Sequence, residues 1–173
     1  MTDSTDQTTG RSIDSATLGV TGAGGFIGER ILKQAADRGM ETRGLDVSEE
    51  AAEHAEDLGA EVVVGDVRDE EAVEAFVAGC DLVIHTAAIV GEGGDMSLYR
   101  DVNVGGTRKV VSAAAEAGVE HFIQISSVMV YGFDFPPDVD EEGPLRGEGN
   151  AYCQTKIESE RVARSHHGEG GME

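Results

Sequence analysis

Short apolar runs alternate with longer segments of helical apolar spacing along most of this 173-residue chain. The short runs, which predict strands, are Ala16–Val20, Glu41–Asp46, Glu61–Val64, Leu82–Thr86 and His121–Ser126. The segments with helical spacing are Phe26–Arg38, Glu49–Leu58, Glu70–Ala78 and Ser97–Ala117, and they are followed by the expected C-terminal caps Gly39, Gly59, Gly79 and Gly118. Strands that alternate with helices in this way predict an α/β fold with a doubly wound parallel sheet.

Two parts of the chain depart from the alternation. Residues 1–15 are polar and rich in Thr, Ser and Asp, which predicts a disordered extension before a single domain at 16–173. The segment Gly132–Gly149 carries three prolines and several acids, and a loop of that length is usually functional or mobile.

A glycine-rich turn, Thr21–Gly28, joins the first strand to the first helix. Gly22 suits a tight bend, Gly25 lets the backbone approach a pyrophosphate, and Gly28 lets the helix pack closely on the strand. The phosphates would then lie at the N-terminus of the helix, where N–H groups are unpaired. The spacing G-x-x-G-x-x-G is a variant of the dinucleotide fingerprint, and an ordinary strand-to-helix turn is the alternative.

Ligands of doubly wound sheets bind beyond the carboxyl ends of the strands, so the residues there are candidates. Asp46 follows the glycine turn at the distance expected of a ribose-binding acid, and neither Val47 nor Ser48 offers a cation to a 2′-phosphate. The pattern therefore favours NAD over NADP. Asp66 can accept a hydrogen bond from the adenine amino group, although capping of the next helix is its alternative role.

Two alanines and a tyrosine–lysine pair complete the candidates. Ala87 and Ala88 are small enough to lie against a cofactor, and tight packing explains them equally well. Tyr152 and Lys156 are four residues apart, which puts them on one face of a helix. A phenol titrates too high for catalysis at neutral pH, and a nearby ammonium lowers its pKa. Ser127 could then hydrogen-bond the reacting oxygen.

Six motifs in a fixed order resemble the extended short-chain dehydrogenases/reductases, the NAD-dependent epimerase/dehydratase family. They are Thr21–Gly28, Gly65–Val67, His85–Ala88, Asn103–Thr107, Ser126–Gly132 and Tyr152–Lys156. The resemblance implies a Rossmann fold, hydride transfer between a secondary alcohol carbon and NAD, and a homodimer in the full-length form. It also implies that Tyr152 is the acid/base, that Lys156 lowers the pKa of Tyr152 and binds the nicotinamide ribose, and that Ser127 orients the substrate.

The cofactor contacts expected from the motifs are spread over the same strand ends. They are Gly22, Gly25, Phe26, Ile27, Gly28, Asp46, Asp66, Val67, Ala87, Ala88, Asn103, Tyr152 and Lys156. For Asn103 a purely structural role is the alternative. No metal site is expected.

The substrate is left open by the sequence. Dehydratases of the family carry an Asp-Glu pair where this chain has Val128 and Met129, which disfavours sugar dehydration. Epimerisation or oxidation–reduction of a nucleotide sugar is favoured, with a hydroxysteroid-like alcohol and a non-catalytic NAD-binding module as alternatives. Because family members are longer, we expect an N-terminal portion that ends before a sixth strand, with the substrate portion absent and His121–Ser126 at a sheet edge.

Charge narrows the choice of partners. The chain has 34 acidic and 13 basic residues and a net charge of −21, which argues against nucleic acid and anionic membranes. No apolar run approaches the ~20 residues of a membrane span, and Cys80 and Cys153 fit no disulfide or metal pattern. These features predict a cytoplasmic protein, and the acid-rich composition favours a high-salt cytoplasm.

Overall fold

Five parallel strands form one sheet in the order β3-β2-β1-β4-β5. The computed structural model describes residues 15–91, 93–134, 137–147 and 149–173, so all but the last residue of the expected N-terminal extension lies outside the described residues. The strands are β1 (Thr17–Thr21), β2 (Glu41–Asp46), β3 (Glu61–Val64), β4 (Leu82–His85) and β5 (His121–Gln124). The predicted doubly wound parallel sheet is confirmed, with strand ends within two residues of the predicted ones.

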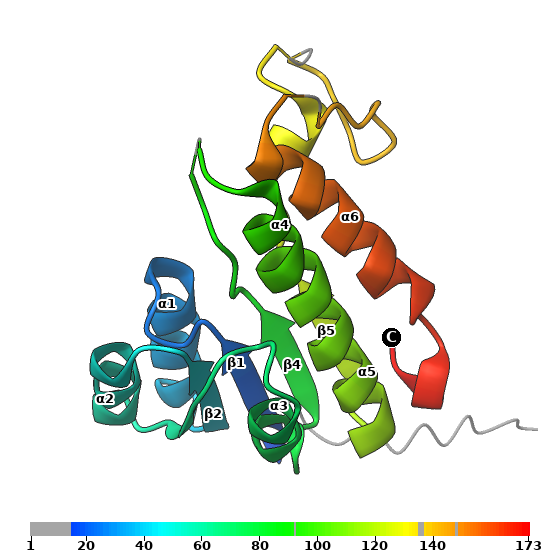
Figure 1. Ribbon diagram of the computed structural model, residues 1–173. Coiled ribbons are helices and arrows are strands. Elements are labelled where there is room, and N and C mark those ends of the chain that lie inside the picture. The colour runs from blue at the N-terminus through cyan, green and yellow to red at the C-terminus, as the bar shows by residue number, and fades with distance from the viewer. Residues whose placement is uncertain (1–14, 92, 135–136, 148) are drawn as a thin grey trace, which may run out of the picture.

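Helices cover both faces of the sheet (Figure 1). One layer holds α1 (Phe26–Ala36) and α2 (Glu49–Asp57), and the other holds α3 (Glu70–Val77), α5 (Thr107–Ala117) and α6 (Ala151–Ser165). Short elements complete the chain, namely α4 (Met96–Tyr99), the π-helix η2 (Arg100–Gly106) and the 3-10 helices η3 (Val128–Tyr131) and η4 (Glu169–Gly171). Figure 1 shows that α4 and α6 extend past the carboxyl ends of the strands.

Each layer has its own apolar core. Leu18 and Val20 of β1 pack with Leu32 of α1 on one face. On the other face, Phe76 of α3 and Val110 of α5 pack against the sheet and are fully buried. Ala23 of the glycine turn belongs to the first core, and Ala87 of the loop after β4 packs against the second. Packing therefore holds both of these segments at the strand ends.

The prediction of one continuous α-helix over Ser97–Ala117 is wrong in the middle of that range. The rod runs from α4 through the π-helix η2 into α5, so the α-helical hydrogen-bond pattern is interrupted for seven residues. This interruption contains the buried Asn103 and the weak helix formers Gly105 and Gly106. A Cβ at Gly106 would lie 2.5 Å from Cγ2 of Val67, so the rod passes very close to the loop after β3.

Core packing accounts for most of the apolar residues on the rod. Val110 and Ala114 are fully buried against the second layer, whereas Leu98 is 44% exposed. The homodimer that the resemblance implies therefore stays a prediction.

Strand β5 is the last strand on its side of the described sheet. The final residue lies along its beginning, where the Phe122 amide donates to the Glu173 carbonyl oxygen at 2.9 Å. Met172 is 2% exposed and belongs to the second core. Ile123 is 45% exposed, so the middle of the strand lies at a partly open edge, as the sequence predicts.

Among the described helices, none is long and apolar enough to cross a membrane.

We predict that multimolar KCl raises the thermal stability of this protein. Its net charge of −21 produces self-repulsion that salt screens. Thermal unfolding followed by circular dichroism in 0.1 M and in multimolar KCl measures the effect, and a Tm that is unchanged or lower in high salt contradicts the prediction.

Candidate functional site

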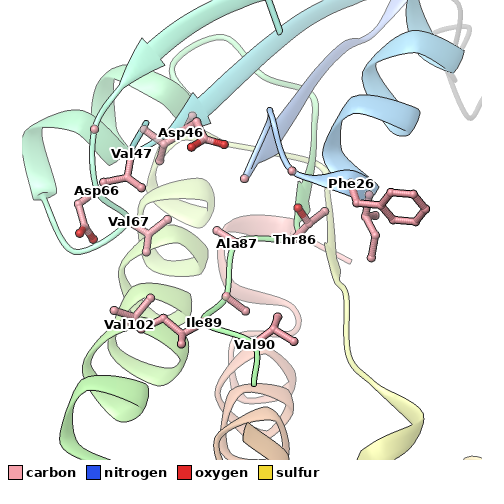
Figure 2. A pocket seen from close by; sticks show the side chains of 16 residues that line it. Phe26, Asp46, Val47, Asp66, Val67, Thr86, Ala87, Ile89, Val90 and Val102 are labelled. Carbon is pink, nitrogen blue, oxygen red and sulfur yellow. The ribbon is translucent and has the colours of Figure 1, made fainter. Parts of the chain in front are cut away.

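A cavity of about 470 Å³ lies beyond the carboxyl ends of the strands (Figure 2). The predicted residues that line it are Gly22, Gly25, Phe26, Ile27, Asp46, Asp66, Val67, Ala87 and Ala88. The other lining residues were not among the expected cofactor contacts, although Gly65 and Thr86 lie in two of the motifs. They are Leu45, Val47, Gly65, Thr86, Ile89, Val90 and Val102. Of these residues, Val90 alone does not adjoin a predicted residue in the sequence. Ile89 and Val90 are brought to the cavity by the loop after β4, and Val102 is brought there by the rod.

The glycine turn forms the floor of the cavity. Gly22 has a φ of 65°, which favours glycine, and a Cβ at Gly28 would lie 2.1 Å from the Gly22 carbonyl oxygen. A Cβ added at Gly25 would lie 3.2 Å from that same oxygen. Gly25 is also the N-cap of α1 and, having no side chain, makes no side-chain cap hydrogen bond there. The first turn of α1 therefore presents its N–H groups beside a lining residue without a side chain, which suits an anionic group.

Asp46 is held in place by two backbone amides. Its Oδ2 accepts from the amide of Gly24 at 3.0 Å, and its Oδ1 accepts from the amide of Ser48 at 3.1 Å. Each carboxylate oxygen retains capacity to accept another hydrogen bond. The lining contains no Lys or Arg among the described residues, so a pair of hydroxyl groups fits this side of the cavity better than a phosphate.

Asp66 has a partner that the sequence did not suggest. The guanidinium of Arg68 donates to both of its oxygens, at 3.0 and 2.6 Å, and the Arg68 amide donates at 2.8 Å. This hydrogen-bonded guanidinium lowers the pKa of Asp66. Asp69 caps α3 through the amides of Glu71 and Ala72, so capping of that helix does not need Asp66.

Asn103 lies behind the cavity and does not line it. It is 1% exposed, its Oδ1 accepts from the Ile89 amide at 2.7 Å, and its Nδ2 donates to the Ile89 carbonyl oxygen at 3.1 Å. Nδ2 also donates to Oγ1 of Thr155 at 3.1 Å. The side chain therefore joins the loop after β4 to α6, which is the structural role that the sequence left as the alternative.

The three predicted catalytic residues lie outside the cavity lining, on β5's continuation and on α6. Ser127 caps η3 by accepting from the amide of Met129 at 3.2 Å. Tyr152 is half-buried one turn before Lys156 on α6. The ammonium of Lys156 donates to the carbonyl oxygen of Ile125, two residues before Ser127, so α6 and the chain leaving β5 are tied together at this point.

Lys156 is 3% exposed, and burial lowers its pKa from 10.5 to about 8. The carboxylate of Glu160, one turn further along α6, acts in the opposite direction and favours the charged ammonium. Glu160 in turn accepts a short hydrogen bond from the hydroxyl of Ser126. An amine that is close to its titration point near neutral pH can stabilise a phenolate on the same helix face.

The sequence profile of the NAD dependent epimerase/dehydratase family matches residues 18–173. A 3-beta-hydroxysteroid dehydrogenase of Mycolicibacterium neoaurum is 35% identical over 163 residues, which make up 88% of this chain and 44% of that protein. The chain thus spans less than half the length of this curated relative.

Two solved structures have the same fold. One is a short-chain dehydrogenase/reductase superfamily protein from Agrobacterium tumefaciens with bound NAD, which is 31% identical with a TM-score of 0.79 and matches 91% of this chain and 47% of that chain. The other is a UDP-glucose 4-epimerase from Bifidobacterium longum in complex with NAD+ and UDP. It is 30% identical with a TM-score of 0.77, and the match covers 87% of this chain and 49% of that one.

The depressed pKa of Lys156 predicts a pH-dependent contribution to stability. Between about pH 8, its pKa in the folded chain, and pH 10.5, its ordinary value, the unfolded chain binds more protons at this group. The free energy of unfolding of the wild type relative to K156M should therefore rise with pH across that window and stay flat below it. Denaturant unfolding of both proteins from pH 6 to pH 10 measures the difference.

Two features make this measurement specific. Burial raises the pKa of the Cys80 thiol to about 11, and this opposing effect cancels because both proteins contain Cys80. The matched control is K33M, which removes a lysine that is 66% exposed and should retain the wild-type pH dependence. A wild-type minus K156M difference that does not change with pH contradicts the prediction.

Proposed function

Because the chain belongs to the NAD dependent epimerase/dehydratase family, we propose that it binds NAD across its strand ends and supplies the acid–base residues for oxidation–reduction of a secondary alcohol. The observation that carries the proposal is the cavity that joins a helix start with a glycine N-cap to the fixed carboxylate of Asp46, with no Lys or Arg among the described lining residues. The chain spans about half the length of the relatives that it matches. We therefore propose that it supplies part of the active site.

The diphosphate would lie over the glycine turn and the first turn of α1. There the backbone amides and the helix dipole favour negative charge, and Gly25 adds no side chain to the floor. The ribose of the adenosine half would bind Asp46, whose two oxygens are oriented by backbone amides. The charge of Asp46 and the cation-free lining favour NAD over NADP.

The adenine would lie near Asp66 and Val67. Asp66 is already paired with Arg68, so its carboxylate would have to share its oxygens between the guanidinium and the adenine amino group. Val67 is 6% exposed in the loop that Gly106 approaches, and this packing fixes the loop. The small residues Ala87 and Ala88 would leave room for the cofactor on the opposite wall.

The chemistry of NAD is to accept a hydride from the alcohol carbon or to return it. In the proposed reaction Tyr152 takes the hydroxyl proton on oxidation and gives it back on reduction. Lys156 stabilises the phenolate through its ammonium, which Glu160 helps to keep charged. Ser127 would hydrogen-bond the reacting oxygen and hold it toward the phenol.

Two substrate classes are supported by different relatives. Likeness to the Bifidobacterium UDP-glucose 4-epimerase favours a nucleotide sugar, for which Val128 and Met129 leave epimerisation but disfavour dehydration. Identity to the Mycolicibacterium 3-beta-hydroxysteroid dehydrogenase favours a larger apolar alcohol. A reaction that needs no net NADH change distinguishes an epimerase from a dehydrogenase.

We predict that the chain binds NAD and that D46N weakens this binding about tenfold, because a charged hydrogen-bond acceptor for the ribose is lost. Isothermal titration at high ionic strength gives Kd for NAD and NADP. The matched control is D37N, which makes the same charge change at the exposed C-cap of α1. Equal NAD affinity in D46N and D37N, or no saturable NAD signal in the wild type, contradicts the assignment.

We also predict that Y152F retains the NAD affinity of the wild type, since only one hydroxyl is removed, while turnover falls by at least about a hundredfold. The rate is measured in the full-length form with UDP-sugars and with a panel of hydroxysteroids and simple ketones. The control is Y99F, which removes a phenol hydroxyl on α4 that donates to the carbonyl oxygen of Gly93. Equal activity of Y152F and the wild type would reject Tyr152 as the acid/base.

A further inference from the structure

A buried chain of polar contacts connects the floor of the cavity to the rod, and His85 lies at its centre. Nδ1 of His85 is 2.6 Å from Oγ1 of Thr21 at the end of β1, and Nε2 is 3.1 Å from Oγ1 of Thr107 at the start of α5. His85, Thr21 and Thr107 are at most 1% exposed. The function proposed above assigns no role to this histidine.

The hydrogen bonds around Thr21 fix the direction of the contact with His85. Oγ1 of Thr21 accepts from the amide of Thr86 and from the amide of Ala87, each at 3.2 Å. A hydroxyl oxygen has two acceptor positions, and these two amides occupy both. The hydroxyl proton of Thr21 must therefore point to His85, so Nδ1 is an acceptor and carries no proton.

The hydrogen bonds around Thr107 lead independently to the same tautomer. The hydroxyl of Thr107 donates to the backbone carbonyl oxygen of Asn103 at 2.6 Å, and a carbonyl can only accept. Its single proton is thus used, and Oγ1 can only accept from His85. Nε2 of His85 must carry the proton, as the contact with Thr21 also requires.

We propose that His85, as a neutral ring protonated on Nε2 only, is a positioning residue that holds the Thr86–Ala87 wall of the cavity and ties it to the helix segment of Asn103. Because Nδ1 of His85 accepts a hydrogen bond from the hydroxyl of Thr21, both acceptor positions of that oxygen remain available to the amides of Thr86 and Ala87. The inference deepens the proposed function and rests on it for the identity of the ligand.

The surroundings of His85 keep the ring neutral. It is fully buried, and burial together with the nearby charge of Lys156 lowers its pKa to about 3. The ring also lies 6.2 Å from that of Phe122 on β5, measured between centroids. A second proton on Nδ1 would face an oxygen whose acceptor positions are filled, so the hydrogen-bond pattern and the burial favour the same state.

The first test reads the tautomer in the ligand-free wild type. Long-range ¹H–¹⁵N spectra of the histidine rings distinguish a bare nitrogen from a protonated one, and H85Q assigns the signal. We expect a protonated Nε2 and a bare Nδ1 for His85 at pH 7, with no change down to pH 5. A protonated Nδ1 would overturn the proposal, and this result does not depend on whether the chain binds NAD.

The second test separates the two nitrogens with a pair of variants. H85N places a carbonyl oxygen near the position of Nδ1 and can still accept from Thr21, whereas H85Q places an amide nitrogen near Nε2 and can donate only to Thr107. We expect the amides of Thr86 and Ala87 to exchange with solvent about tenfold faster in H85Q than in H85N, because their acceptor is less well oriented. The Kd for NAD should be about tenfold weaker in H85Q than in H85N.

A merely structural role of His85 predicts the opposite order of the two variants in amide exchange rate and in NAD affinity. If His85 only filled space, the larger glutamine would leave a smaller packing void than asparagine and would therefore disturb the site less. Equal exchange rates and equal NAD affinities in the two variants, or weaker binding in H85N, would overturn the proposal. A wild type that binds no NAD while H85Q still accelerates exchange at Thr86 and Ala87 would overturn the proposed function and leave the positioning role intact.

Discussion

The carboxamide of Asn103 is the point at which the segments around the candidate site meet. Its oxygen and nitrogen hold both backbone groups of Ile89, and its nitrogen also reaches Thr155 on α6. Asn103 is 1% exposed, so each lost contact would leave a buried polar atom of its carboxamide without a partner. The loop after β4, the rod and α6 are consequently placed as one unit over the strand ends, and the cavity and the candidate catalytic residues take their positions from that unit.

Much of the fold could be predicted because its signals are local. Apolar runs, helical spacing and glycine stops identify strands and helices without knowledge of their contacts, and parallel pairing then brings Asp46, Asp66 and Ala87 to one edge. The π-helix at Arg100–Gly106 was not predicted. Its cause is tertiary, since the rod must approach the loop after β3 at Gly106 and direct Asn103 toward Ile89.

The site was predictable to the same extent. Residues next to a strand end or a glycine turn were identified, but the pairing of Asp66 with Arg68 and the contribution of Val102 to the cavity depend on side-chain geometry and on packing between distant segments. The tautomer of His85 is a further case, because it follows from the summed hydrogen bonds of Thr21 and Thr107. The roles of Ser127, Tyr152 and Lys156 in catalysis remain predictions from their motif, now with a buried amine and its carboxylate neighbour described.

The π-helix also bears on how such a protein can change during evolution. Loss of a single codon between Arg100 and Gly106 would allow the rod to close into an uninterrupted α-helix, because the surplus residue of the wide turn would be gone. Adjacent positions of an α-helix differ by about 100° in direction, so the Asn103 carboxamide that now hydrogen-bonds Ile89 would point in another direction. A lineage could thus keep the outline of this domain and lose the contact that holds the loop after β4 in one genetic step.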